Sequence, residues 1–263
     1  MDLIELTEQK KDKRNSRHPW EQARLEFIYK KVKKHLEPNN TVIFLDIGCG
    51  DTFVAEQLIE RIPNSHFYCI DTAFTKKQLF HYSKKYENIN IMVFNNLKEA
   101  TSQVESEISF VLILDVIEHV KNDVNFLVQI EQLKQFNSTS KILITVPAFQ
   151  SLFTHHDYLL GHYRRYTNKS LEFVTLKSGL QTIQKGYFFT SLLLPRFILK
   201  ISELISKPKS QSTSISKWSK GKLITILYKN ILILDFLITS FIEKIHLKPI
   251  GLSNYIICKK RVS

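Results

Sequence analysis

Short apolar runs that alternate with amphipathic segments constrain the fold of this chain more than any other feature. Residues 41–47 (TVIFLDI) form one such run, and others follow at 66–70, 89–94, 110–114 and 141–146. Segments with a helical spacing of apolar residues lie between them, at 52–62, 74–86 and 124–135. Strands buried on both faces have uninterrupted apolar sequences, and strands that alternate with helices form parallel sheets. The sequence therefore predicts an α/β fold with a doubly wound, mostly parallel sheet.

The flanking segments predict four parts within the 263 residues. Leu25, Ile28 and Val32 recur at helical spacing, so residues 1–40 are expected to form an N-terminal helical cap. A core follows at 41–189, where residues 170–178 predict a helix and 182–189 a strand. Residues 190–248 predict a basic insertion of two amphipathic helices around a Ser- and Lys-rich linker. Residues 249–263 then predict a closing strand (LSNYIICKK).

Composition narrows the class of protein. A hydrophobic fraction of 43% and a charged fraction of 24% exclude global disorder. The three cysteines are scattered without a CxxC pair, so a disulfide framework or a structural zinc site is not expected and a reducing compartment fits best. The first twenty residues lack the apolar core of a secretion signal, so we expect a cytoplasmic protein.

The positive charge is concentrated in the last part of the chain. From Lys185 onward there are 14 basic and 3 acidic residues, whereas residues 1–184 carry 23 basic and 22 acidic ones. The apolar windows 187–201 and 223–242 are interrupted by charged residues, which favours helices at a membrane surface over spanning ones. Nucleic acid is an unlikely partner because the aromatic residues lie among aliphatic ones. We expect peripheral contact with an anionic membrane, with a helical lid or dimer face as the alternative; the oligomeric state stays open.

A glycine turn follows the first predicted strand, at Asp46-Ile47-Gly48-Cys49-Gly50-Asp51-Thr52. The two glycines allow a sharp bend and close approach to a ligand. Phe53 stands where a dinucleotide fingerprint needs a small residue, and no GKS or GKT is present, which disfavours NAD, FAD and ATP loops. Asp71 ends the second strand and could accept both hydroxyls of a ribose; its alternative role is a helix cap.

DIGCGDT, the acid in CIDT and LDVIEHVKND after the fourth strand together resemble the class I S-adenosylmethionine-dependent methyltransferases. The resemblance covers residues 41–189 and the closing strand, and implies a seven-stranded Rossmann-like sheet with an antiparallel final strand. It implies S-adenosylmethionine as the cofactor. Asp46, Gly48, Cys49 and Gly50 would border its methionine part, and Asp71 with Thr72 would lie at its ribose. Asn95 or Asn96 would lie at the adenine, and Asp115 would belong to the floor between cofactor and acceptor. The segments RHPWEQAR and VPAFQSLFTHHDYLLGHYRRYT resemble a narrower branch linked to cell-surface glycan, lipid or quinone modification.

Methyl transfer to a hydroxyl needs alignment and a base, but no metal, and no spaced set of metal ligands stands out. The candidate bases are His119, His156 and His162, which could instead cap a helix or lie in a solvated loop. The arginines and aromatics of the same loop suit recognition of an anionic or sugar group. Their alternative is a surface patch in which Glu118 and Asp123 pair with the arginines. The candidate acceptor-binding residues are Asp157, Tyr163, Arg164, Arg165 and Tyr166.

These features predict a methyltransferase, expected to O-methylate a lipid-linked, glycan or other membrane-proximal small acceptor. Two alternatives stay open: a methyltransferase that acts on RNA or protein, and a non-catalytic module with the same fold. The chain lacks a (D/N)PP(Y/F/W) motif, which argues against methylation of base amino groups. The acidic and glycine residues of the cofactor motif are retained, which argues against a non-catalytic module.

Overall fold

A single seven-stranded sheet organises the part of the chain that the computed structural model describes, residues 17–37, 40–205, 218, 220–245 and 247–261. Its strand order is β3-β2-β1-β4-β5-β7-β6. Only β7 runs antiparallel to its neighbours, β5 and β6. The predicted α/β class and the antiparallel closing strand are confirmed. The strands are β1 (Val42–Ile47), β2 (Ser65–Ile70), β3 (Ile91–Phe94), β4 (Phe110–Leu114), β5 (Lys141–Pro147), β6 (Leu180–Phe188) and β7 (Ser253–Lys260).

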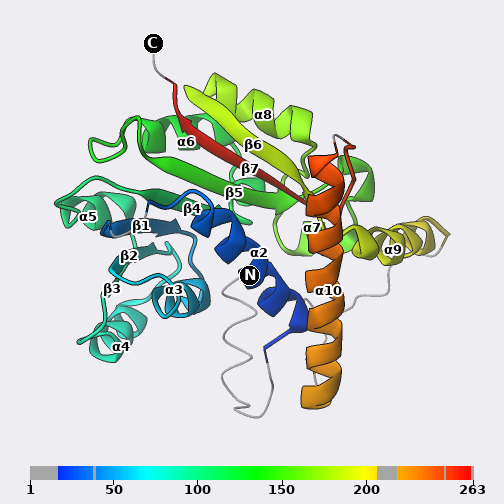
Figure 1. Cartoon of the computed structure of the whole chain (residues 1–263), viewed down its shortest axis with the longest axis horizontal. Coiled ribbons are helices and arrows are strands. Elements are labelled where there is room, and N and C mark those ends of the chain that lie inside the picture. Colours follow the sequence, from blue (N-terminus) through cyan, green and yellow to red (C-terminus); the bar gives the residue numbers. More distant parts are fainter. Residues whose placement is uncertain (1–16, 38–39, 206–217, 219, 246, 262–263) are drawn as a thin grey trace.

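Helices cover both faces of the sheet, with α2 and α3 on one face and α6 and α8 on the other (Figure 1). Three single turns of 3₁₀ helix mark loops at the sheet edge: η1 (Ile117–His119), η2 (Gln150–Leu152) and η3 (Thr190–Leu192). The helices are α2 (Pro19–Lys33), α3 (Phe53–Ile59), α4 (Lys76–Lys85), α5 (Leu97–Ser102), α6 (Asp123–Glu131), α7 (His155–Leu159), α8 (Asn168–Lys177), α9 (Leu193–Ile205) and α10 (Gly221–Lys244).

The sheet separates two apolar cores. In β1, Val42 and Phe44 point into the core beneath α2 and α3, whereas Ile43 and Leu45 point into the core beneath α6 and α8. Successive side chains of a strand point to opposite faces, so every residue of β1 is buried. This is the physical reason for the uninterrupted apolar run in the sequence.

Two segments differ from the sequence expectation. Helix α5 was not predicted, because six residues are too few to show a helical period. Asn96 caps its start: the Asn96 side chain accepts a hydrogen bond from the Glu99 N–H at 2.8 Å. The connection between β5 and α8, for which the sequence analysis predicts neither a strand nor a helix, contains η2 and α7. Thr154 and Asp157 form a capping box at the start of α7, which stabilises this short helix.

The insertion before β7 consists of α9 and α10 in its described part; most of the predicted Ser- and Lys-rich linker lies outside the described residues. One side of α10 is buried, at Thr225, Leu232, Phe236 and Thr239, and packs against α2. The opposite side exposes apolar residues at Leu223, Leu227, Leu234, Ile238 and Phe241. Among the described helices, α10 alone has the length and composition that could cross a membrane, although the sequence analysis favoured a surface position.

Candidate functional site

A cleft opens at the carboxyl ends of the strands, between the glycine turn and α2. Parallel α/β sheets bind their ligands at this edge. The glycine turn forms one wall through Gly48, Cys49 and Gly50, and α2 forms the other through Glu21, Arg24 and Ile28. The predicted N-terminal helix thus lies over the expected cofactor site.

Both the backbone conformation and the neighbouring atoms at position 48 require glycine. Its φ of +72° lies in the left-handed region, and a Cβ there would lie 2.5 Å from Cγ2 of Val116. The Gly48 N–H also donates to the Ile70 carbonyl at 2.7 Å. No other residue type fits this close approach of the turn to the segment after β4.

Asp71 holds the glycine turn from the end of β2. Its carboxylate accepts hydrogen bonds from the backbone N–H groups of Gly50 and Ala73, both at 3.0 Å. Thr72 follows it and is exposed. At the end of β3, Asn96 serves as the cap of α5, while Asn95 is half-buried and accepts a hydrogen bond from the Asn96 amide at 3.0 Å. Asp71 is therefore the one of these residues that a hydrogen bond holds against the glycine turn.

A buried arginine that the sequence analysis did not single out lies in the cleft wall. Arg24 pairs with Asp115 at 3.0 Å and donates to Thr145 Oγ1 at 3.3 Å. Its Nε atom and the Oδ2 atom of Asp46 are buried without a hydrogen-bond partner. Burial raises the pKa of Asp46 to about 7, despite the opposing charge of Arg24. The position of Arg24 in the sequence could have predicted its role: it lies four residues after Trp20 and four before Ile28, on the apolar side of α2.

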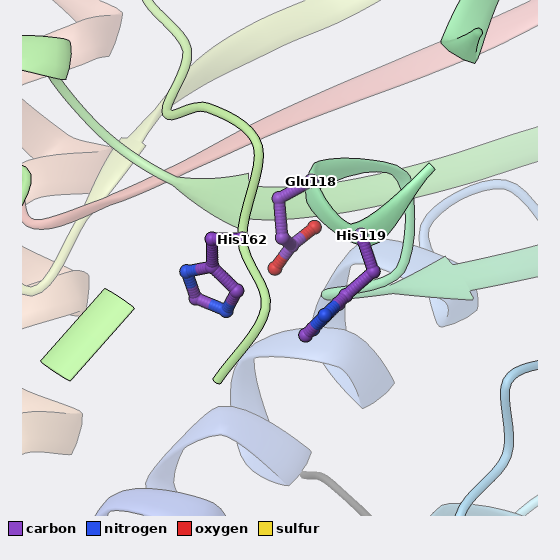
Figure 2. Close-up of side chains that lie close together, drawn as sticks. All are labelled: Glu118, His119 and His162. Carbon is purple, nitrogen blue, oxygen red and sulfur yellow. The ribbon is translucent and has the colours of Figure 1, made fainter. Parts of the chain in front are cut away.

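Two loops bring Glu118, His119 and His162 together: η1 supplies the first two residues, and the segment between α7 and α8 supplies His162. Potential ligand atoms of the three side chains lie within 4.8 Å of one another, and Figure 2 shows them pointing toward a common centre. Glu118 is fully buried and neither of its carboxylate oxygens has a hydrogen-bond partner. Burial and the nearby Asp115 raise the pKa of Glu118 well above its usual value. Two of the three predicted bases thus lie beside each other, over a carboxyl group.

Asp157 lies at the centre of a buried network of cations. It pairs with Arg165 at 2.7 Å, with Arg196 of α9, and with Nδ1 of His162 at 3.0 Å. Burial opposes ionisation of Asp157, but the hydrogen bond from His162 and the charges of the two arginines outweigh it and hold its pKa below the usual range. Asp157 and Arg165 make these contacts with other residues of the protein. The two side chains therefore anchor this part of the loop to the rest of the fold.

The remaining predicted acceptor residues divide between internal contacts and the surface. Arg164 pairs with Asp123 at 2.8 Å, as the alternative interpretation of the arginines expected. Tyr166 is buried and its hydroxyl donates to the same carboxylate at 2.7 Å. Tyr163 is exposed. His156 is half-buried apart from the pair of imidazoles, and burial together with Arg196 lowers its pKa.

Comparison with known protein families gives no match. Among curated proteins, the chain is similar to the ubiquinone biosynthesis O-methyltransferase of Rickettsia typhi, with 26% identity over 117 residues. That match covers 44% of this chain and 46% of the relative. The chain therefore spans less than half the length of the curated relative it matches.

Solved structures share the fold at low identity. A protein described as a sarcosine dimethylglycine methyltransferase from Galdieria sulphuraria superposes with a TM-score of 0.54 at 11% identity, covering 90% of this chain and 85% of the other. Phosphoethanolamine N-methyltransferase 2 from Haemonchus contortus, solved with S-adenosyl-L-methionine, gives 0.52 at 16% identity, covering 89% and 52%. The [4+2]-cyclase SpnF gives 0.52 at 10% identity, covering 90% and 81%. Strand order, the glycine turn and these likenesses together identify the fold of this chain as that of the class I S-adenosylmethionine-dependent methyltransferases.

Proposed function

We propose that the protein is an S-adenosylmethionine-dependent methyltransferase that methylates a hydroxyl group of a lipid-linked or other membrane-proximal acceptor. The observation that carries the first part is the pair of buried, unpartnered polar atoms in the cleft, Arg24 Nε and Asp46 Oδ2. Buried polar atoms without partners are rare in folded proteins and point to a ligand that completes them. The curated relative, by its name an O-methyltransferase, supports the choice of a hydroxyl acceptor.

The cleft residues fit the cofactor group by group. Asp46 would accept from the ammonium of the methionine part, and Arg24 would hold its carboxylate, because both side chains lie in the wall beside the glycine turn. Asp71 would accept the ribose hydroxyls, and Asn95 would lie toward the adenine. The cofactor supplies an activated methyl group. The protein would align the acceptor hydroxyl with the methyl group, and His119 or His162 would take the proton from that hydroxyl.

We expect the affinity for S-adenosylmethionine to rise with pH through about 7, because Asp46 must be ionised to hold an ammonium group. Below that pKa the carboxyl is protonated, so binding should weaken by up to about tenfold per pH unit. Titration calorimetry between about pH 5.5 and 7.5 tests this, since the amino group of the cofactor stays protonated below about pH 7.7.

Asp46→Asn should bind weakly and lose this pH dependence. Asp51→Asn is the matched control, because Asp51 lines the same cleft but pairs with Arg17. An affinity in Asp46→Asn equal to that of the wild type would remove Asp46 from the cofactor site. Failure of the wild type to bind S-adenosylmethionine or S-adenosylhomocysteine at any of these pH values would contradict the proposed function.

The second part of the proposal, a membrane-proximal acceptor, is supported by the insertion. The exposed apolar side of α10 faces away from α2, and α9 exposes Leu194, Phe197, Ile198, Ile201 and Leu204. Apolar patches of this extent mark surfaces that bind a membrane or a partner. Asp235, in the middle of α10, accepts hydrogen bonds from the backbone of Thr190 at 3.1 Å and Ser191 at 2.7 Å. A spanning position would break this attachment to the body, so we favour α10 lying along the membrane surface.

Replacing Leu223, Leu227 and Leu234 with Gln should reduce binding to anionic vesicles by more than tenfold, because burial of one leucine contributes about 1.5–3 kcal/mol. Replacing Lys220, Lys222 and Lys229 with Gln should weaken binding to anionic vesicles by about 1 kcal/mol per residue and leave neutral vesicles almost unaffected. Co-sedimentation of the full chain with vesicles, at low and high salt, measures both effects.

The matched control for the leucines replaces Phe173, Leu176 and Ile183, which are exposed on α8 and β6, with Gln. These changes should leave vesicle binding unaltered. Resistance of the bound wild type to both carbonate and high salt would instead assign α10 a spanning position. Absence of binding to every vesicle would contradict the membrane proposal and leave a second copy of the chain as the partner of the apolar face.

Methyl transfer itself is tested by incubating the protein and methyl-labelled S-adenosylmethionine with a lipid extract and, separately, with a water-soluble extract of the source cells. A labelled species that gains the mass of one CH₂ in the lipid fraction supports the proposal. Label confined to the aqueous fraction would contradict the membrane-proximal acceptor but leave methyl transfer intact.

A further inference from the structure

The buried carboxyl of Glu118 is the least satisfied group at the acceptor side. Both oxygens lack a hydrogen-bond partner although the side chain has no exposed surface. A carboxyl group placed in this way requires a proton or a cation. The two imidazoles that Figure 2 shows beside it supply further electron-pair donors within 4.8 Å.

We propose that Glu118, His119 and His162 bind one divalent transition-metal ion. Two imidazoles and one carboxylate form a donor set that zinc, iron and cobalt sites use, whereas magnesium and calcium prefer oxygen ligands alone. Three protein ligands also leave a position open for an exchangeable oxygen, as catalytic metal sites require. The ligands of a tetrahedral ion lie about 3.4 Å apart, so ligand atoms that lie within 4.8 Å of one another need to close by at most about 1.4 Å.

The surroundings of His162 fit this role. Its Nδ1 atom lies 3.0 Å from Oδ1 of Asp157, and Asp157 is held by Arg165 and Arg196. An ionised carboxylate at Nδ1 fixes the proton on that atom and leaves the lone pair of Nε2 for a metal. Carboxylate–histidine–metal arrangements of this kind orient the imidazole and raise its basicity. The backbone N–H of Tyr163 also donates to the Glu118 carbonyl at 2.7 Å, which joins the two loops that supply the ligands.

The place of the site indicates what the ion would do. Glu118 and His119 lie in η1, three residues after Asp115 and Val116 respectively. Asp115 and Val116 border the cofactor turn through Arg24 and Gly48. With the ion bound, the two imidazoles would hold the metal instead of taking the proton, and an acceptor hydroxyl at the open position would lose its proton to water more readily. Its oxygen would then attack the methyl carbon: the O–CH₃ bond forms, the S–CH₃ bond breaks, and sulfur keeps the electron pair and loses its positive charge. This role rests on the proposed function, but metal binding does not.

The test uses the full chain without a histidine tag, stripped with a chelator and titrated with Co²⁺ and Zn²⁺. We expect about one equivalent to bind, with the visible absorption of a nitrogen- and oxygen-ligated Co²⁺. Glu118→Gln, His119→Ala and His162→Ala should each weaken binding by more than 100-fold. His81→Ala, in exposed α4, and His155→Ala, in the same loop as the site but outside the cluster, are the matched controls and should bind normally.

Thermal unfolding distinguishes the loss of a metal ligand from poor folding of a variant. Zn²⁺ should raise the unfolding temperature of the wild type and of both controls but not that of the three ligand variants. Stoichiometric binding that survives in all three ligand variants, or no binding by a folded wild type, would overturn the proposal. Glu118 would then be a buried protonated carboxyl beneath two packed imidazoles.

The metal and the methyl donor are measured separately on the same preparations. Bound metal without affinity for S-adenosylmethionine would contradict the proposed function and leave the metal site standing. Equal methyl transfer by stripped and reloaded protein would overturn the catalytic role of the ion alone.

Discussion

Asp157→Ala is expected to lower the free energy of unfolding by about 3–5 kcal/mol, the loss typical when one member of a buried ion pair is removed. Asp157 is 1% exposed and is the shared partner of Arg165, Arg196 and His162. Its removal takes away the carboxylate that Arg165 and Arg196, two guanidinium groups with little exposed surface, share. It also removes the capping box of α7. Urea unfolding monitored by circular dichroism measures the change.

Glu172→Gln is the matched control for this prediction. Glu172 pairs with Lys185, but both side chains of that pair are about one-third exposed, so its loss should lower stability by less than about 1 kcal/mol. A triple variant that adds Arg165→Met and Arg196→Met to Asp157→Ala should recover part of the stability, because the uncompensated charges are gone. A loss below about 1 kcal/mol in Asp157→Ala would show that water or another group satisfies these arginines.

The Asp157 carboxylate also joins two parts of the chain that lie far apart in the sequence. Arg165 belongs to the loop between α7 and α8, whereas Arg196 belongs to α9 in the basic insertion. The same contact therefore connects the candidate membrane surface to the loop that supplies His162.

The sheet could be predicted from the sequence because its strands are buried on both faces. The prediction for β4 has the observed bounds, residues 110–114, since all five residues are apolar and buried. The closing strand was predicted at 252–260 and begins one residue later, at Ser253. Bounds of helices were less accurate: a helical cap was expected within residues 1–40, and in the described part of that range the helix α2 covers Pro19–Lys33.

The site was predictable only in the part formed by one continuous segment. The glycine turn and Asp71 have a fixed spacing along the chain, which the sequence displays directly. Arg24 and Glu118 depend on contacts between distant segments: Arg24 bonds Thr145, 121 residues away. Asp157 was predicted to bind the acceptor, whereas its partner Arg196 lies 39 residues further along, in a helix whose position the sequence does not specify. The exposed side of α10 is at least as apolar as the buried side, which includes Thr225 and Thr239. Apolar composition therefore does not show which side packs against α2.

Gly48→Ala is expected to lower the free energy of unfolding by about 2–5 kcal/mol and to weaken S-adenosylmethionine binding by more than tenfold. The backbone contributes about 1–2 kcal/mol, because a Cβ is disfavoured at a φ of +72°. The surroundings contribute about 1–3 kcal/mol more, because that Cβ would lie 2.5 Å from Val116 Cγ2 in a closely packed region. Relief of this contact must move either the cofactor turn or the loop after β4, and both border the cleft.

Gly161→Ala isolates the backbone part of this effect. Gly161 has a φ of +76°, but a Cβ there would meet no atom within 4 Å, so only the cost of about 1–2 kcal/mol should be seen and cofactor affinity should not change. Adding Val116→Ala to Gly48→Ala should restore the steric part of the stability and most of the affinity, which a double-mutant cycle measures. Equal losses in Gly48→Ala and Gly161→Ala, with no coupling to Val116, would show that the turn yields freely at this point. The close contact between the cofactor turn and the acceptor-side loop would then contribute nothing to the shape of the cleft.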